Sequence, residues 1–159
     1  MKKEHLFSIL RIGMGWIFLW PFLDKLFGLG FTTTSDRSWL SGNSPTTGFL
    51  SGSHGPFGAI FQSMAGNVFV DWLFMGGLLL IGLALIFGIG MKIACYTGGL
   101  LLVMMWLATL PPEHNPFLDE HLIYALILFT LLKIDSTKYF GFSKEWSKNK
   151  IAKDYPFLK

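Results

Sequence analysis

Two uncharged runs of twenty residues, 72–91 and 93–112, constrain this chain more than any other feature, and only Lys92 separates them. An α-helix rises about 1.5 Å per residue, so each run covers about 30 Å, the thickness of the hydrocarbon core of a bilayer. Composition agrees, because 14% of the residues are charged, against about 25% in an ordinary soluble domain. The sequence therefore predicts an integral membrane protein with a tight helical hairpin at Lys92.

Two further segments are apolar but shorter. Residues 6–23 are interrupted only by Arg11, and residues 122–132 lie between His121 and Lys133. Either segment reaches full length only by taking ionisable residues into the membrane. We therefore predict an all-α polytopic fold, a four-helix transmembrane bundle. Its helices are expected at about residues 5–27, 70–90, 92–110 and 117–135, with a long outer loop at 28–67 and a basic cytoplasmic tail at 136–159.

Small residues four apart predict where these helices approach each other closely. The pairs are Ala84 with Gly88 in the second span and Ala94 with Gly98 in the third.

The distribution of lysine and arginine predicts the orientation, because these residues accumulate on the cytoplasmic side. An N-in arrangement leaves only Lys25 and Arg37 toward the outside and places inside Lys2, Lys3, Arg11, Lys92 and the seven lysines after Leu132. We expect a multi-pass protein of the plasma membrane with both termini cytoplasmic. The tail is expected to lie on anionic headgroups, with docking of a partner as the alternative. Since the basic residues flank membrane segments, a nucleic-acid partner is not expected.

Charged residues in the first and last spans are too close together along the helix for both to lie outside the hydrocarbon core. Arg11 and Lys25 are fourteen residues apart, about 21 Å along a helix and less than the hydrocarbon core. We therefore expect these two helices to lie side by side and neutralise each other. The expected contacts are Lys25 with Asp119 or Glu120, and a structural ion pair between Arg11 and Asp135. Snorkelling of the long side chains toward water is the alternative.

Many ionisable residues should meet at the outer end of the bundle. They are Asp24, Lys25, Asp71, Glu113, His114, Asp119, Glu120 and His121. Asn115 and Pro116 fit the N-cap and first position of the last helix. Acidic residues in a first helical turn have a structural explanation in the helix dipole, and a binding site is the other interpretation of this rim.

The outer loop of about forty residues is long for a compact bundle, and such loops are usually functional. We interpret it as a lid over the outer end. Trp39 and Phe61 are candidates to close over a ligand, and Arg37 is the obvious cation for an anion. A loop that lies on the membrane without a ligand is the alternative.

Three stretches together resemble the DoxX/DoxD family of small membrane proteins, over residues 5–135. They are Arg11-Ile12-Gly13 through Asp24-Lys25-Leu26-Phe27-Gly28, the glycine-rich helix after Asp71, and Asn115-Pro116-Phe117-Leu118-Asp119-Glu120-His121. The last stretch is the most specific. The resemblance implies the fold more firmly than the reaction. It also implies a membrane subunit of a thiosulfate:quinone oxidoreductase that works with a partner subunit called DoxA.

The first hypothesis is accordingly a subunit of a quinone-linked oxidoreductase, with quinone as substrate or bound lipid. Proton delivery would fall to Asp24, Asp119, Glu120 and His121. Substrate binding would involve Lys25 and Arg37, which would hold a small anion such as thiosulfate, and Trp39 and Phe61.

The second hypothesis is a non-enzymatic membrane module that binds or passes a small molecule, or scaffolds a partner. The single cysteine, Cys95, excludes a disulfide and a cysteine-ligated cluster within the chain, and no metal or haem is expected. Whether the chain is an enzyme, and whether it forms a homo-oligomer, stays open at the level of sequence.

Overall fold

The computed structural model describes residues 2–134 and 136–155, and within these ranges the regular elements are all helical. The helices are α1 (Lys3–Phe27), α2 (Thr47–Ser51), α3 (Gly58–Ser63), α4 (Val68–Phe87), α5 (Met91–Ala108), α6 (Glu120–Leu131), α7 (Ser143–Lys148) and α8 (Lys150–Asp154). Short 3-10 turns lie at Ser35–Arg37, Trp39–Ser41 and Gly55–Phe57.

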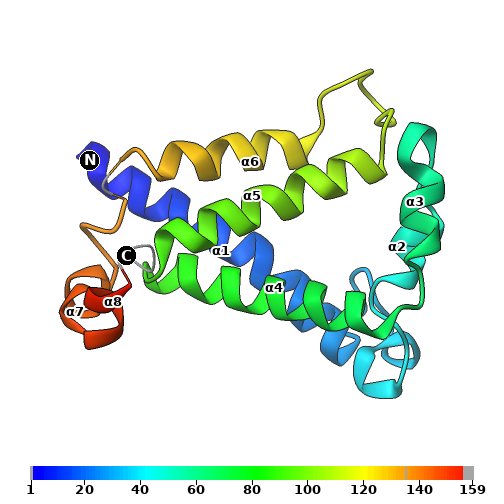
Figure 1. Ribbon diagram of the computed structural model, residues 1–159, viewed down its shortest axis with the longest axis horizontal. Helices are drawn as coiled ribbons and strands as arrows, with labels where there is room; N and C mark the ends of the chain where they lie inside the picture. The colour runs from blue at the N-terminus through cyan, green and yellow to red at the C-terminus, as the bar shows by residue number, and fades with distance from the viewer. Residues whose placement is uncertain (1, 135, 156–159) are drawn as a thin grey trace.

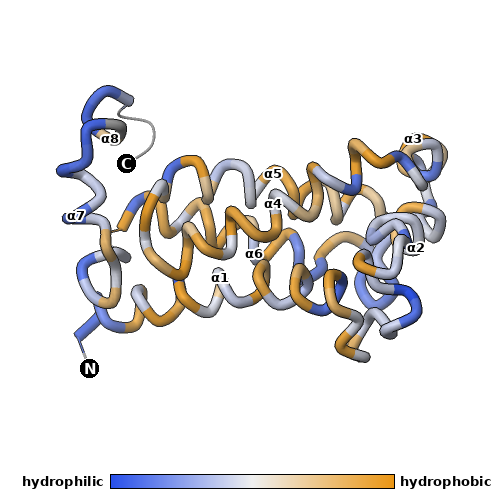
Figure 2. Tube along the Cα trace, turned by 90° about the horizontal axis from the view of Figure 1, so that it is seen from below, coloured by the Kyte–Doolittle hydropathy of each residue, from blue (hydrophilic) through white to orange (hydrophobic). Residues whose placement is uncertain are grey.

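Three of these helices, α1, α4 and α5, are long and apolar enough to cross a membrane. Helix α6 is apolar but has only 12 residues, about 18 Å of rise. Hydrophobic residues fill the middle of the molecule, and hydrophilic residues gather toward its two ends (Figure 2). This banding is what a helical membrane protein requires.

The two ends of the molecule differ in what they contain (Figure 1). One end, here called the hairpin end, holds the turn between α4 and α5, the start of α1 and helices α7 and α8. The other, the loop end, holds residues 28–67 and the start of α6. The hairpin turn is tight because Gly88 and Gly90 adopt the left-handed backbone conformation, with φ of 67° and 59°.

The long helices pack as two pairs, α1 on α4 and α5 on α6, and the hairpin joins α4 to α5. The pairs lie together at the hairpin end and diverge toward the loop end, where α2 and α3 lie across the gap (Figure 1). Helices α1 and α6 do touch, but less extensively than either touches its own pair partner. The expected side-by-side contact of the first and last spans is therefore only a minor part of the packing.

Helices α1 and α4 cross at Gly15 and Gly82. A Cβ atom added to Gly15 would lie 2.9 Å from the carbonyl oxygen of Gly82, and one added to Gly82 would lie 2.9 Å from the backbone nitrogen of Leu19. The two backbones are thus in direct contact, as at other small-residue crossings in membranes. Gly88, where the sequence also predicts close approach, caps the end of α4, and a Cβ added there would lie 2.9 Å from Nη1 of Arg11 rather than against a helix backbone.

Arg11 is completely buried where the two helix pairs meet. Its Nε donates to the carbonyl of Ser136 at 3.0 Å, and its Nη2 donates to the carbonyl of Phe140 at 2.8 Å. Its Nη1 donates to the carbonyls of Ile86, at 2.9 Å, and Leu85. The last carbonyls of a helix have no partner within it and carry partial negative charge, so a cation at the end of α4 is favourable. Asp135, the expected partner of Arg11, lies outside the described residues.

The segment after α6 folds back on the bundle. The backbone N–H of Phe142 donates to the carbonyl of Phe87 at 2.9 Å, and the rings of His5 and Tyr139 stack at 3.9 Å. The lysines of its described part are exposed, as expected for a basic tail, but its backbone is bonded to Arg11 of α1 and to Phe87 at the end of α4.

Candidate functional site

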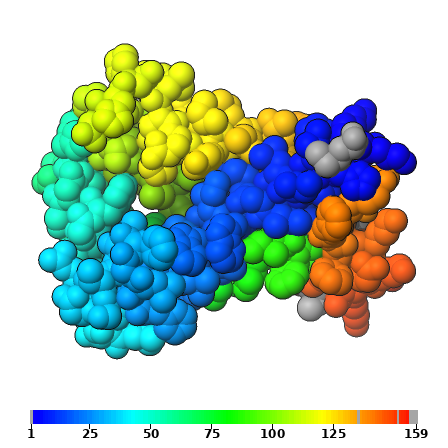
Figure 3. Space-filling model, turned by 180° about the vertical axis from the view of Figure 1, so that it is seen from behind, coloured from blue at the N-terminus to red at the C-terminus, as the bar shows by residue number. Residues whose placement is uncertain are grey.

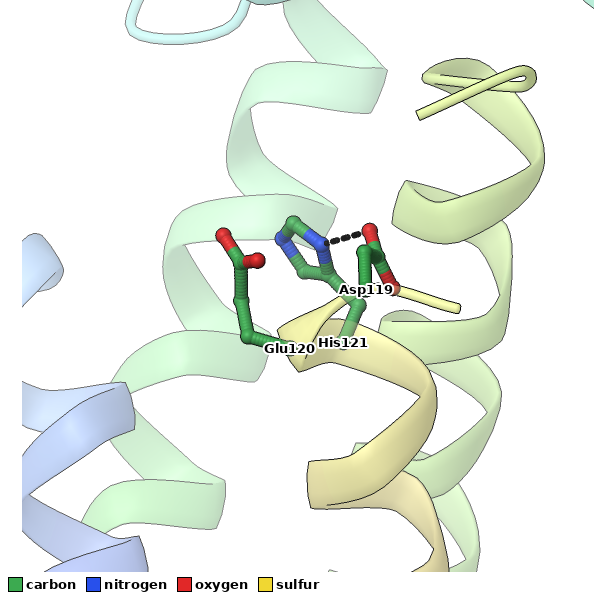
Figure 4. A group of neighbouring side chains, drawn as sticks. All are labelled: Asp119, Glu120 and His121. Carbon is green, nitrogen blue, oxygen red and sulfur yellow. Dashed lines mark hydrogen bonds and ion pairs between the residues drawn. The ribbon is translucent and has the colours of Figure 1, made fainter. Parts of the chain in front are cut away.

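The start of α6 brings an aspartate and a histidine together (Figure 4). Asp119 is the N-cap of α6, and its Oδ1 accepts from the backbone N–H of Leu122 at 3.1 Å. Its Oδ2 lies 2.7 Å from Nδ1 of His121. The cap therefore fixes the carboxylate, and the carboxylate in turn orients the imidazole.

The helix begins at Glu120, later than the sequence predicts, and Asn115 is not its N-cap. The side chain of Asn115 instead accepts from the backbone N–H groups of Phe117 and Leu118, at 2.9 and 2.8 Å. This local turn supplies an acceptor to the backbone N–H groups that would otherwise lie in the first turn of a helix. The helix therefore starts only after the next residue that can cap it.

The pairing suits His121 to proton transfer. A bond from Nδ1–H to a carboxylate fixes the tautomer and leaves Nε2 free to exchange a proton with a ligand. In the described part of the chain Nε2 of His121 makes no hydrogen bond. The two side chains are mostly shielded, with exposed fractions of 17% for His121 and 9% for Asp119.

Glu120 completes a small cluster with this pair and is exposed. One ligand atom from each of the three residues lies within 4.8 Å of the others. Three donors are one short of the closed tetrahedral set of a structural zinc site and equal the number of protein ligands in an open, catalytic one.

Asp24, a predicted proton carrier, has another role. Its carboxylate is 1% exposed. It accepts from the backbone N–H groups of Phe31, Thr32 and Thr33, at 3.2, 2.8 and 3.0 Å, and from the hydroxyl of Thr32 at 2.7 Å. The carboxylate thus holds the first turn of the segment 28–67 against the end of α1.

We expect Asp24→Asn to loosen this turn. The amide has one oxygen in place of two, and its NH₂ group would face backbone donors, so about 1–3 kcal/mol of unfolding free energy should be lost. Thermal unfolding in detergent and limited proteolysis within residues 28–67 measure the effect. Glu113→Gln, on an exposed side chain, is the control. Identical melting and cleavage for the two variants would contradict the assignment.

Asp71 anchors the loop a second time. It is 4% exposed, and its Oδ1 accepts from the hydroxyls of Ser44, at 2.8 Å, and Thr46, at 2.5 Å. These bonds join the middle of the loop to the start of α4. The sequence places Asp71 on the charged rim but contains no signal for its two hydroxyl partners.

The predicted substrate-binding cations lie apart from the Asp119–His121 pair. Lys25 is half-buried and, among the described residues, makes no ion pair with Asp119 or Glu120. That expected contact was wrong because α1 and α6 diverge at the loop end. Arg37 is exposed at the end of a 3-10 turn.

The two predicted aromatic residues both serve packing. Trp39 lies against the main core, with its ring 4.6 Å from that of Trp72. Phe61 is 6% exposed and packs with Leu50 and Ala108, which fixes α3 on the end of α5.

The surface is hollowed between the loop, α1 and the segment that leads into α6 (Figure 3). The start of α6 lies on the same side of the molecule, with α4 behind the three side chains (Figure 4). The loop end therefore has both a surface hollow and an oriented histidine.

These features define a class, an all-helical protein with three helices able to cross a membrane and a charged cluster at the loop end. No family model matches the sequence, and no curated protein or solved structure matches it.

Proposed function

We propose that this chain is the membrane subunit of a quinone-linked oxidoreductase of the DoxD type, in which His121 exchanges protons with a quinone at the loop end. The observation that supports it best is the 2.7 Å contact between Asp119 and His121. In this proposal α6 forms a fourth span together with residues 115–119 and 132–134. The loop end lies outside the plasma membrane, and both termini are cytoplasmic.

Reduction of a quinone to a quinol takes two electrons and two protons. His121 would donate a proton from Nε2 to a quinone carbonyl, while Asp119 stabilises the imidazolium before transfer. Glu120 is exposed and would return protons from water.

The electrons would come from a small anion such as thiosulfate, directly or through a DoxA-like partner. Lys25 supports this part, because it is half-buried and, among the described residues, has no ion pair. A cation in that state attracts an anionic ligand, and Arg37, exposed in the 28–67 segment of the loop end, is a second cation.

One observation favours the alternative, a non-enzymatic module that binds or passes a small molecule or scaffolds a partner. Asp24 and Asp71 are both engaged by the loop, so part of the charged rim is explained by folding alone. Such a module would keep the hollow and the charged cluster without catalysing electron transfer.

The test is thiosulfate-dependent reduction of a soluble quinone by the purified protein, with and without its co-purifying partners. We expect His121→Ala to lower the rate at least about 100-fold, the usual contribution of a positioned acid–base group. His114→Ala, an exposed histidine seven residues earlier, should change it less than about twofold. Lipid extraction should also yield bound quinone.

Two outcomes would count against the proposal. An active wild type in which His121→Ala behaves like His114→Ala would remove histidine from the reaction. A wild type with neither activity nor bound quinone would favour the non-enzymatic module.

A further inference from the structure

We propose that the hairpin end binds the headgroup of an anionic phospholipid in a cavity between the α4–α5 turn and α7. The proposal is independent of the quinone chemistry, which concerns the opposite end of the molecule.

The cavity has a volume of about 180 Å³ and is amphipathic. Met91, Leu132 and Trp146 form apolar walls, and Lys92 and Ser143 supply a cation and a hydroxyl group. Ser147 also lines the cavity, but its hydroxyl donates to the carbonyl of Lys144. A phosphate diester with attached acyl chains has the same division into a polar, negative part and an apolar part. A soluble anion would use only the polar half of these walls.

The position of the cavity relative to the membrane-crossing helices fits a lipid headgroup. Helix α5 begins at Met91, so Lys92 lies in the first turn of an apolar helix able to cross a membrane. A lysine at this position stands at the level of the lipid phosphates.

The surface around the cavity is strongly positive. Its exposed lysines are Lys2, Lys3, Lys92, Lys133, Lys138, Lys144, Lys148, Lys150 and Lys153. The described acidic residues at this end are Glu4, Glu145 and Asp154, and Glu4 already lies 4.0 Å from Lys138. This excess of positive charge is complementary to an anionic leaflet.

Hydrogen bonds fix the segment that leads into α7 at the hairpin end of the bundle. Phe140 is bonded to Arg11, and Phe142 to Phe87. Phe140 and Phe142 are 65% and 58% exposed, and aromatic side chains are favourable at the membrane interface. The lysines of α7 are therefore placed beside the membrane rather than on a free tail.

A second cavity at the same end, of about 240 Å³, repeats this chemistry. It is lined by Lys3, Lys138, Glu4, Phe7 and Ile134. Its one acidic residue is the partner of Lys138, which makes it less suited to an anion than the cavity beside Lys92.

The experiment compares binding of phosphatidylglycerol and phosphatidylcholine to the full-length protein in neutral detergent, by native mass spectrometry. Wild type should prefer phosphatidylglycerol. Lys92→Gln should reduce that preference at least about fivefold, the contribution of one lysine near an anionic surface, and Lys92→Arg should retain it. Lys150→Gln removes an exposed lysine of the same end that does not line the cavity and should change the preference less than about twofold.

Each other result overturns the proposal. Equal losses for Lys92→Gln and Lys150→Gln would show a diffuse surface charge rather than a site. No preference in the wild type would exclude the lipid. Tight binding of a soluble polyanion such as heparin, without selectivity among lipids, would identify an acidic macromolecule as the partner instead. Melting temperatures of the exposed-site variants provide the check on folding.

Discussion

Arg11→Gln is expected to lower the free energy of unfolding by about 3–6 kcal/mol, because it removes at least two hydrogen bonds from a charged group, each contributing about 1.5–3 kcal/mol. Arg11 is fully buried and donates to four carbonyls, two at the end of α4 and two in the segment after α6. Glutamine is shorter and has two donor hydrogens, so at least two of the four carbonyls would lose their bond to residue 11, and the carbonyl of Ser136 would keep only the hydroxyl of Ser8. The same change should release the segment that begins at Ser136.

The measurement is unfolding in detergent, by heat or denaturant, together with proteolysis after residue 136. Arg11→Lys separates charge from geometry, because an ammonium keeps the charge but lacks the planar fork that reaches several carbonyls. We expect an intermediate loss for this variant. Lys133→Gln, on an exposed side chain, serves as the control. Equal stability of Arg11→Gln and Lys133→Gln would show that the network contributes nothing.

Gly82→Val is expected to separate α1 from α4 and to cost about 1–3 kcal/mol or more, as overpacking does in other interiors. A Cβ at this position would lie 2.9 Å from the backbone nitrogen of Leu19 and 3.1 Å from the carbonyl oxygen of Gly15. Both neighbours are backbone atoms, which cannot rotate away as a side chain would. The helices must therefore move apart, and the contacts along the whole crossing weaken.

Gly76→Val, on the same helix, provides the matched control. A Cβ at Gly76 meets nothing within 4 Å, so this variant changes the helix without touching the crossing. Thermal unfolding of the two variants in the same detergent gives the comparison. If both melt at the same temperature, close backbone contact at Gly82 is not needed for the packing of α1 on α4.

The candidate site shows how much of its structure can be predicted from the positions of charged residues in the sequence alone. The sequence predicts a rim of ionisable residues, but Asp24, Asp71 and Asp119 look alike within it. Their differences come from segments distant in the chain or from local turns. Thr32 and Thr46 fold back on the first two, whereas the turn at Asn115 leaves Asp119 to cap α6 and orient His121. The spacing of residues along the sequence does not show which donors will reach a given carboxylate.

By itself the sequence determined that α1, α4 and α5 would be long apolar helices, because length and hydropathy are properties of each segment taken alone. It also determined that the hairpin turn would lie near Lys92. Only the tertiary structure decided that α1 pairs with α4 rather than α6, since that choice depends on the fit of Gly15 against Gly82. It also decided that Arg11 donates to backbone carbonyl groups. Because every residue has a backbone carbonyl, the pattern of side chains does not show which of them Arg11 will reach.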